Sequence, residues 1–269
     1  MIYAIHGVVQ NFSQKKFCHR DFLDYNLFKT HLRTRKKKYV SLEKALENKG
    51  DALTIDDSLL GALEAAILCR NFGHDVSLFI NPFYIEERIL YWFCLLNIFL
   101  DHAPSIKIIW ENEEYLLNSF EEKIKFRIKI KNKIAKLPTE EERQTFLKLF
   151  SKDFFDCHFQ IPSHLDLLTI DDLRNARNLG IEIHNHGWTH RQLTEVSHIE
   201  LDEEILKAKK WFQNKLYINT DFYAVPFGKD LPSDKYNFDN FRIWFLTYYQ
   251  LHYGKIGPKI YNRAPLILK

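Results

Sequence analysis

Short apolar segments alternate with helical patterns along most of the chain, and this alternation constrains the fold more than any other feature. We expect helices at residues 39–48, 59–72, 169–179 and 197–216. We expect strands at residues 2–9, 52–55, 76–80, 181–184 and 222–225. Strands that alternate with helices are typical of βα units around a parallel sheet. The sequence therefore predicts an α/β fold.

The chain has 269 residues and contains no repeat, low-complexity tract or Pro/Gly/Ser-rich linker. A chain of this length can bury one full core, so we expect a single domain spanning residues 1–269. The segment from about 112 to 156 differs because it carries Glu, Lys and Arg at helical spacing. Pro138 ends one helical pattern there, and Thr139 with the acids after it begins the next. We interpret this segment as a helical insertion on the surface of the domain.

Charge and cysteine usage exclude several kinds of protein. The net charge is +3 and no nucleic-acid motif is present, so we expect no binding to nucleic acid. The one basic cluster, residues 33–38, is either a solvated surface or an anion site that would suit a lipid-linked or nucleotide-linked substrate.

The cysteines form no CxxC pair, which argues against a disulfide framework and a thiolate zinc site. We interpret them as core residues or unreactive thiols: Cys18, Cys69, Cys94 and Cys157.

The first residues lack the pattern of a secretory signal, which predicts a cytoplasmic location. The longest apolar stretch, residues 89–100, is about half the roughly 20 residues that a membrane-spanning helix needs, and it contains Asn97. We expect a buried helix there and no transmembrane segment. The sequence does not define an oligomeric state.

The pentapeptide LTIDD occurs at residues 53–57 and again at residues 168–172. In the second copy Thr169 precedes a helical pattern, so we interpret it as an N-cap whose acids complement the helix dipole. In the first copy Asp56 and Asp57 follow a short apolar strand. Ligands bind at the carboxyl ends of strands in α/β sheets and barrels. The first copy is therefore the functional candidate, although Asp57 could instead cap the helix that follows.

A second predicted strand end carries His184, His186 and His190. His186 and His190 are four residues apart, so both imidazoles would project from one face if this segment turned helically. Two imidazoles and one carboxylate form a site for Zn²⁺ or a similar divalent ion, and Asp57 is the obvious carboxylate. An isolated pair with this spacing is more often two surface or core histidines. The position at a strand end, beside a third histidine, favours the metal site here.

Two adjacent aspartates allow a division of labour in such a site. One carboxylate can bind the metal, while its neighbour takes a proton from water. Consecutive side chains of a strand point to opposite sides, so a turn must follow the strand directly if both are to enter one pocket. The sequence at residues 58–61 is compatible with such a turn.

Three motifs in this order resemble those of the polysaccharide deacetylases of the NodB-homology group, also called carbohydrate esterase family four. That family carries motifs of the types Thr-Phe-Asp-Asp-Gly, His-(Ser/Thr)-x-x-His and Arg-x-Pro-(Tyr/Phe)-Gly. Residues 54–58, 186–190 and 222–228 are similar to them, and the similarity extends from His6 to Arg263 around the insertion. The resemblance implies a distorted, incomplete (β/α) barrel.

The resemblance also implies the chemistry. Asp56 would be the general base, and Asp57, His186 and His190 would be the metal ligands. The reaction would be hydrolysis of an N-acetyl group on a sugar, which suits a metal that polarises the acetyl carbonyl. Zn²⁺ is the first expectation because two imidazoles suit it, and Co²⁺ or Ni²⁺ would also fit the donor set.

Several residues are expected to contact the substrate. Four residues of the third motif would form one wall of the sugar groove: Tyr223, Pro226, Phe227 and Gly228. His6, close to a strand end, is expected to face the substrate as well. Trp188, inside the histidine motif, is either a packing residue or a platform for a sugar ring.

Three features depart from the family pattern. Ser58 replaces the usual Gly. Ala224 stands where many members have the Arg that orients the base, and we hypothesise that Arg263 supplies a charge near Asp56 instead. The late Leu-x-x-His motif, which carries the general acid, has no match at the right spacing. The candidates for that acid are three histidines: His6, His184 and His252.

The sequence thus predicts a metal-dependent N-deacetylase acting on a poly- or oligosaccharide, or on its lipid-linked or nucleotide-linked precursor. Synthesis of a bacterial surface polysaccharide is the expected context. One alternative is another amidase-type or imidase-type C–N hydrolase with the same site. A second is a degenerate member that binds sugar without turnover, suggested by Ala224 and the missing acid.

Overall fold

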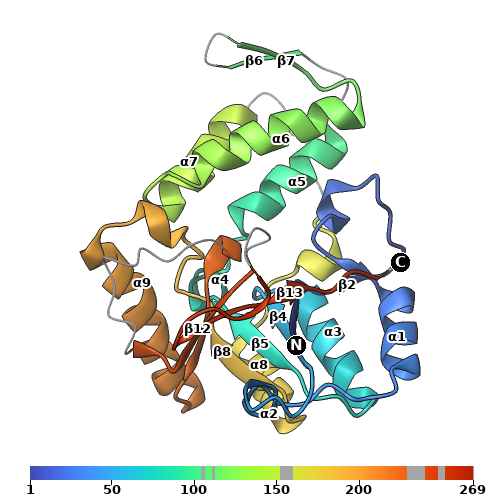
Figure 1. The fold of residues 1–269 in the computed structure, drawn as a ribbon. Helices are drawn as coiled ribbons and strands as arrows, with labels where there is room; N and C mark the ends of the chain where they lie inside the picture. The colour runs from blue at the N-terminus through green and yellow to red at the C-terminus, as the bar shows by residue number, and fades with distance from the viewer. Residues whose placement is uncertain (104–106, 111–112, 152–159, 229–239, 248–251, 269) are drawn as a thin grey trace. The chain divides into compact units, whose positions relative to one another are not determined.

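The chain forms two compact units in the computed structural model, which describes residues 1–103, 107–110, 113–151, 160–228, 240–247 and 252–268 (Figure 1). The larger unit comprises Met1–Phe12, Asp21–Ile89 and Ser163–Lys269, and the smaller comprises Ser13–Arg20 and Leu90–Pro162. The smaller unit contains the segment predicted as an insertion and begins well before it. The single domain expected from the sequence stays a prediction.

One sheet organises the larger unit. Among the described residues its strands follow the order β11 (Gly254–Lys255), β12 (Ile260–Asn262), β10 (Ile243–Leu246), β9 (Phe222–Ala224), β8 (Glu182–Asn185), β5 (Ser77–Ile80), β4 (Ala52–Asp56), β1 (Ile2–Ile5) and β13 (Ala264–Pro265). Every pairing in it is parallel except that of β11 with β12. The α/β fold predicted from the alternation of strands and helices is confirmed.

This sheet curls into a nearly closed barrel because β12 and β13, which follow each other in the chain, lie at its two opposite sides. β12 pairs with β10 and β13 pairs with β1, yet only Arg263 separates β12 from β13. The backbone N–H of Arg263 donates to the carbonyl of Leu246 at 2.9 Å. Inside the barrel the rings of Phe79 and Phe245 lie 5.7 Å apart, although two strands separate β5 from β10 in the sheet. The barrel implied by the family resemblance is confirmed.

Helices of the larger unit connect these strands. They are α1 (Tyr25–Thr34), α2 (Leu42–Leu46), α3 (Leu60–Asn71), α4 (Pro82–Glu87), α8 (Ile170–Asn178) and α9 (His198–Trp211), which continues as a π-helical segment, η4 (Phe212–Leu216). Short 3₁₀ turns are η2 (Ser163–Leu165), η3 (Leu193–Glu195) and η5 (Pro226–Gly228), and β2 (Val8–Val9) pairs with β3 (Leu23–Asp24). α3 is buried along most of its length and packs in one core cluster with residues of β1, β4 and β5. Because α3 is packed in this way, it holds the carboxyl end of β4, which precedes it in the chain, in a fixed position.

The strand predicted at residues 2–9 is interrupted. β1 ends at Ile5 and β2 begins at Val8. Between them Gly7 has a φ of +134°, and a Cβ atom there would lie 2.5 Å from the backbone carbonyl carbon of Gly61. The start of α3 therefore comes too close to this backbone for any side chain, and the strand breaks at the glycine.

Capping residues decide where the helices begin. Thr169 forms a capping box at the start of α8: its Oγ1 accepts from the N–H of Asp172 at 3.1 Å, and its own N–H donates to that carboxylate at 2.8 Å. The structural interpretation of the second LTIDD copy is confirmed. The helix predicted at residues 39–48 is shorter, because Ser41 caps it and α2 begins only at Leu42.

The smaller unit is built from α5 (Trp92–His102), α6 (Phe120–Ile134), α7 (Glu140–Ser151), the hairpin of β6 (Lys107–Trp110) with β7 (Glu113–Leu116), and the turn η1 (Phe17–His19). The predicted break is confirmed, since Thr139 Oγ1 accepts from the N–H of Glu142 at 3.1 Å where α7 begins. The segment predicted as a helical insertion also contains a strand, Glu113–Leu116, which is extended because it pairs with Lys107–Trp110, outside the predicted bounds.

Inside the smaller unit, Arg127 Nε donates to Asn97 Oδ1 at 2.7 Å, and both residues are buried. This bond satisfies the amide that interrupts the apolar stretch of residues 89–100, and the buried helix predicted there is confirmed as α5. None of the helices among the described residues combines the length and apolar character needed to cross a membrane.

Three of the four cysteines, Cys18, Cys69 and Cys94, are buried and form no disulfide with one another, while Cys157 lies outside the described residues. Burial raises the pKa of the Cys69 thiol well above its ordinary value. The thiol therefore stays protonated and unreactive at neutral pH, as predicted.

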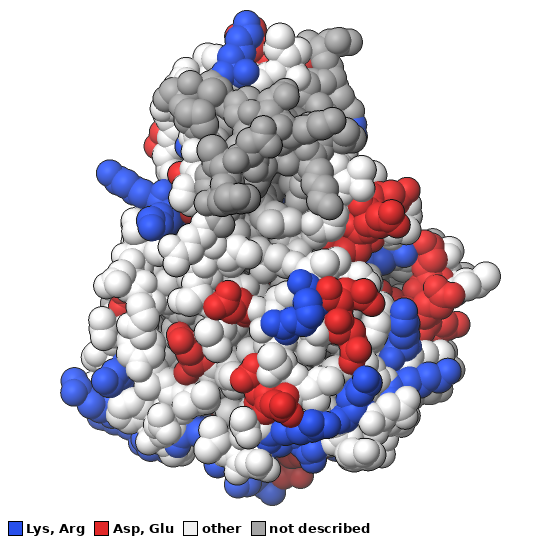
Figure 2. Space-filling model, turned by 180° about the vertical axis from the view of Figure 1, so that it is seen from behind, with Lys and Arg blue, Asp and Glu red and all other residues white. Residues whose placement is uncertain are grey.

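The basic run at residues 33–38 has two kinds of member. Lys36, Lys37 and Lys38 are exposed, whereas Arg35 pairs with Asp51 and lies 4.1 Å above the ring of Tyr39. On the face drawn in Figure 2, basic and acidic side chains are interspersed over the described residues of its lower part. The run is thus partly structural.

Thr169→Ala should lower the free energy of unfolding by about 1 kcal/mol, because the side-chain cap of α8 is lost. Urea denaturation of the variant and of Thr169→Ser, which keeps the hydroxyl, measures this difference. An unchanged midpoint in Thr169→Ala would contradict the capping role.

Candidate metal centre

The two aspartates of the first LTIDD copy lie at the carboxyl end of β4. Asp56 is the last residue of the strand, and Asp57 adopts a φ of +79° directly after it. This left-handed turn is the one that the sequence required for both carboxylates to enter one pocket. Ser58 then anchors the turn, since its hydroxyl accepts from the N–H of Asn81 at 2.9 Å and donates to its carbonyl at 3.0 Å.

The two histidines follow β8, which ends at Asn185. The segment of residues 186–190 does not turn helically but forms an irregular loop. Gly187 has a φ of +85° and His190 a φ of +54°. These two left-handed residues fold the loop back, so that the imidazoles of His186 and His190 lie 4.9 Å apart between ring centroids. A tight loop therefore achieves what the helical spacing was expected to provide.

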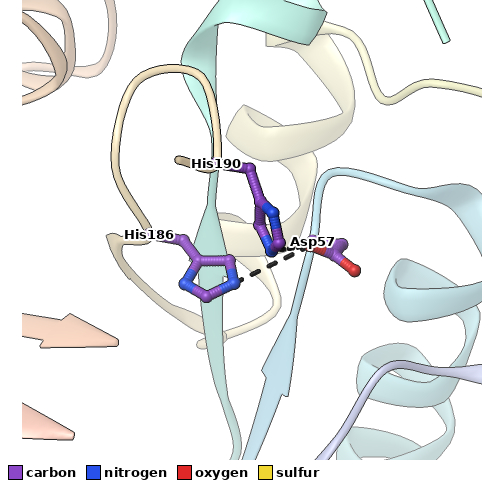
Figure 3. Close-up of side chains that lie close together, drawn as sticks. All are labelled: Asp57, His186 and His190. Carbon is purple, nitrogen blue, oxygen red and sulfur yellow. Dashed lines mark ion pairs between the residues drawn. The ribbon is translucent and has the colours of Figure 1, made fainter. Parts of the chain in front are cut away.

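Three side chains converge from these two segments (Figure 3). The Nε2 atom of His186 lies 3.7 Å from Asp57 Oδ1, and the Nε2 atom of His190 lies 3.5 Å from the same oxygen. One ligand atom of each residue lies within 4.8 Å of the other two, and all three residues are buried. The arrangement could hold one divalent metal ion between two nitrogens and an oxygen, which is a donor set that suits Zn²⁺.

The hydrogen bond at Nδ1 of His186 leaves its Nε2 atom available to bind a metal ion. Its Nδ1 atom lies 2.8 Å from the carbonyl of Ala224, which can only accept, so Nδ1 carries the proton and Nε2 presents a lone pair. Burial lowers the pKa of His186 to about 4, against an opposing effect of the Asp56 charge. The ring is therefore neutral at physiological pH, as a metal ligand must be.

Asp56 is held by Arg263 rather than by the histidines. The guanidinium donates twice, from Nη1 to Oδ1 at 2.7 Å and from Nη2 to Oδ2 at 2.6 Å. Nη1 also donates to Thr54 Oγ1 at 2.9 Å, and Nε donates to the carbonyl of Leu246 at 3.3 Å. Burial by itself would raise the pKa of Asp56, but Arg263 and then His186 outweigh it and hold the pKa below its ordinary value. Asp56 is therefore a buried carboxylate that stays ionised.

The residues of the third motif lie in different surroundings. Phe227 is half-buried, has a φ of +62°, and places its ring 4.9 Å from that of His190. Pro226 and Gly228 are buried beside it. Tyr223 is fully buried, its ring packs against Trp244 at 4.7 Å, and its hydroxyl lies beside Gly187 of the histidine loop. Phe227 therefore lies against His190, one of the three candidate metal ligands.

Trp188 is half-buried and has neighbours on its ring. Lys207 Nζ lies 4.5 Å from the ring centroid, and Phe83 makes an edge contact at 6.1 Å. Its backbone N–H donates to the carbonyl of Glu204 at 3.0 Å. These contacts favour the packing interpretation over the sugar platform.

The three candidate acid histidines lie in different environments. His6 is half-buried and directly follows β1, beside β4, and its charge acts on both Asp56 and His186. His184 points into the barrel, where its ring lies 5.4 Å from that of Phe79. His252 is exposed. His6 is therefore the candidate that interacts electrostatically with Asp56 and His186.

Sequence reasoning missed two buried residues that hold the site together. Asn81 follows β5, and its side-chain amide donates to the carbonyls of His186 at 2.5 Å and Gly187 at 3.1 Å. Glu204 lies on α9 and accepts from Thr189. Asn81 had a signal in the sequence, because it is a polar residue at a predicted strand end. Glu204 had none, since it is one of many acids on a charged helix.

Comparison with known proteins agrees with the motifs. The family model of the polysaccharide deacetylases matches residues 154–237. The comparison with curated proteins finds no match.

Solved structures match nearly the whole chain. The deacetylase PplD of Streptococcus pyogenes, solved in complex with acetate, is 14% identical with a TM-score of 0.58, over 99% of this chain and 91% of its own. A de-N-acetylase from Aggregatibacter actinomycetemcomitans is 13% identical with a TM-score of 0.57, over 98% and 93%. IcaB from Ammonifex degensii is 10% identical with a TM-score of 0.56, over 99% and 91%. Such low identity shows the fold alone, and together with the family match it confirms the resemblance inferred from the motifs.

Arg263→Gln should lower the free energy of unfolding by about 3–5 kcal/mol at neutral pH, because it leaves the buried Asp56 carboxylate without its cation. Arg242→Gln is the matched control. It breaks an ion pair with Glu43 whose side chains are 51% and 46% exposed, so its cost should stay below about 1 kcal/mol. Equal losses in the two variants would contradict the account of the buried pair.

The difference between wild type and Arg263→Gln should shrink as the pH falls. In wild type the lowered pKa of Asp56 contributes stability above the ordinary value of 3.8, and this contribution disappears as the pH falls through the lowered value. In the variant, burial without Arg263 raises the pKa, so Asp56 takes up a proton and loses its unpaired charge at a higher pH. Urea titrations between pH 4 and pH 7 measure this convergence, and parallel stability curves would contradict it.

Proposed function

We propose that this chain, which has the family match and the fold of polysaccharide deacetylases, is a metal-dependent hydrolase that removes an N-acetyl group from an amino sugar. The substrate is a poly- or oligosaccharide, or its lipid-linked or nucleotide-linked precursor. One observation carries the proposal: the convergence of Asp57, His186 and His190 next to an ionised Asp56. The Streptococcus pyogenes deacetylase was captured with acetate, which is the product that this reaction requires.

Asp57, His186 and His190 would hold the metal. When bound, a divalent ion supplies a Lewis acid for the acetyl carbonyl and makes water a better nucleophile at neutral pH. Zn²⁺ is our first choice, and Co²⁺ or Ni²⁺ fit the same donors. The Phe227 ring packs edge-on against His190 at 4.9 Å between ring centroids.

Asp56 would be the general base. Its carboxylate is ionised at neutral pH and neighbours the ligand Asp57 in the chain, so it can accept the proton that water loses on attack. Arg263 holds both carboxylate oxygens of this base in place, and each oxygen keeps a lone pair that can accept the proton. Arg263 thereby takes the place of the arginine that Ala224 replaces.

His6 would protonate the leaving amine. Ile5 pairs with Ile55 in the parallel register of β1 and β4, His6 and Asp56 follow these two residues, and the charge of His6 acts on Asp56. His6 is also half-buried, so it can meet both the substrate and the site. The proton donor therefore comes from the start of the chain rather than from a late motif.

The proposed biological setting is the synthesis of a bacterial surface polysaccharide, acting on a precursor in the cytoplasm. The family match supports the substrate class, and Arg263 on Asp56 weakens the case for a degenerate member that binds sugar without turnover.

Metal-free protein should release no acetate from N-acetylhexosamine oligomers, and added Zn²⁺ or Co²⁺ should restore release. Asp56→Asn should keep the metal but lower kcat by about 10²–10⁴-fold, whereas Asp57→Asn should lose the metal. Acetate release together with metal content after dialysis measures both. Bound metal with no acetate release from a broad glycan panel would favour a sugar-binding protein, and release of ammonia or ring opening from small cyclic amides would favour an imidase-type hydrolase.

His6→Gln should lower kcat by about 10²-fold or more while leaving metal content unchanged, because it removes the proton donor but no ligand. The loss should be smaller for a substrate whose leaving group needs no proton, such as an activated aryl acetate. His252→Gln is the control and should keep wild-type rates. A His6→Gln variant equally impaired on both substrates would contradict the role as an acid.

A further inference from the structure

The loop between the two histidines is built around a buried carboxylate that comes from another element. Glu204 lies in the middle of α9 and is 4% exposed. It accepts from the N–H of Thr189 at 2.6 Å and from the Thr189 hydroxyl at 2.7 Å. The N–H of Arg191 points to the same carboxylate at 3.4 Å. One side chain thus receives three donors from the two residues that flank His190.

This arrangement explains the backbone of His190. A non-glycine residue in the left-handed region costs about 1–2 kcal/mol, so something must hold it there. The N–H groups of Thr189 and Arg191, one before and one after His190, converge on the same oxygen of Glu204, Oε1. Backbone N–H groups around a left-handed residue form a concavity that binds an anion. Here the anion is supplied by the chain itself, and bonds to a charged acceptor are about twice as strong as neutral ones.

Gly187 leaves the space that Glu204 occupies. A Cβ atom at this position would lie 2.9 Å from Glu204 Oε1 and 2.9 Å from the hydroxyl of Tyr223. In the family motif a Ser or Thr stands here, whereas this chain has no side chain at the position. A distant carboxylate therefore fills the place next to the first metal ligand.

We propose that Glu204 is a positioning residue that holds His190, and with it the metal-binding form of the histidine loop, through this anion-binding turn. The inference rests on the proposed metal site and extends it to α9. Other contacts anchor the loop at separate points, since Asn81 holds the carbonyl of His186 and Tyr84 donates to the carbonyl of Thr189 at 3.1 Å. Glu204 acts on both sides of His190, through the N–H groups of Thr189 and Arg191.

The test uses the full-length metal-free protein titrated with Co²⁺ alone, read by the visible absorption of the bound ion and by competition with a chelator. Glu204→Gln keeps the shape and removes the charge, and it should weaken Co²⁺ binding about tenfold or more. Glu204→Ala should weaken it further and alter the Co²⁺ spectrum. Glu203→Gln, the exposed neighbour on the same helix, is the matched control and should bind like wild type.

Thr189→Val and Thr189→Ser keep the test decisive even where Glu204→Ala does not fold. Valine removes the hydroxyl donor and should weaken Co²⁺ binding several-fold, whereas serine should restore wild-type affinity. Folded Glu204→Gln and Thr189→Val proteins with wild-type affinity and spectrum would overturn the inference, even if their thermal stability were lower. A wild-type protein that binds no Co²⁺ would instead overturn the proposed metal site itself.

Discussion

Asp57 and His186 follow strands that are not neighbours, and the site depends on bridging the distance between them. β5 lies between β4 and β8, so the two strand ends are separated by roughly 10 Å, which is twice the spacing of paired strands. Asn81, at the end of β5, spans this gap: its backbone bonds with Ser58 on one side and its amide binds the carbonyl of His186 on the other. The left-handed turn at Asp57 and the folded loop before His190 then bring the ligand atoms within reach of one ion.

The closure of the barrel brings a positive charge to Asp56. Arg263 is the single residue between β12 and β13, so the segment that joins the two sides of the sheet also carries the guanidinium to Asp56. A buried carboxylate without a cation would take up a proton or destabilise the fold. Folding of the C-terminal segment and the ionised state of Asp56 are therefore coupled.

Sequence reasoning reached the features that local chemistry controls. The βα alternation predicted the parallel sheet, Thr169 with Asp172 predicted a helix start, and the strand-end acids and histidines pointed to the side chains that now converge. It failed where the outcome depends on a distant partner. The strand at Glu113–Leu116 exists because Lys107–Trp110 pairs with it, and the loop at His190 turns back because Glu204 receives its amides. Tyr223 was expected at the groove wall, and its contact with sugar stays a prediction, although the structure buries the ring among core residues.

The claim on which the function rests is that one divalent ion binds between three buried side chains. Anomalous diffraction at the zinc absorption edge, from crystals grown with Zn²⁺, tests it most directly. We predict a single strong peak at about 2.0–2.2 Å from Asp57 Oδ1 and from the Nε2 atoms of His186 and His190. A Zn²⁺ peak on other side chains, with these three left without metal, would contradict the claim.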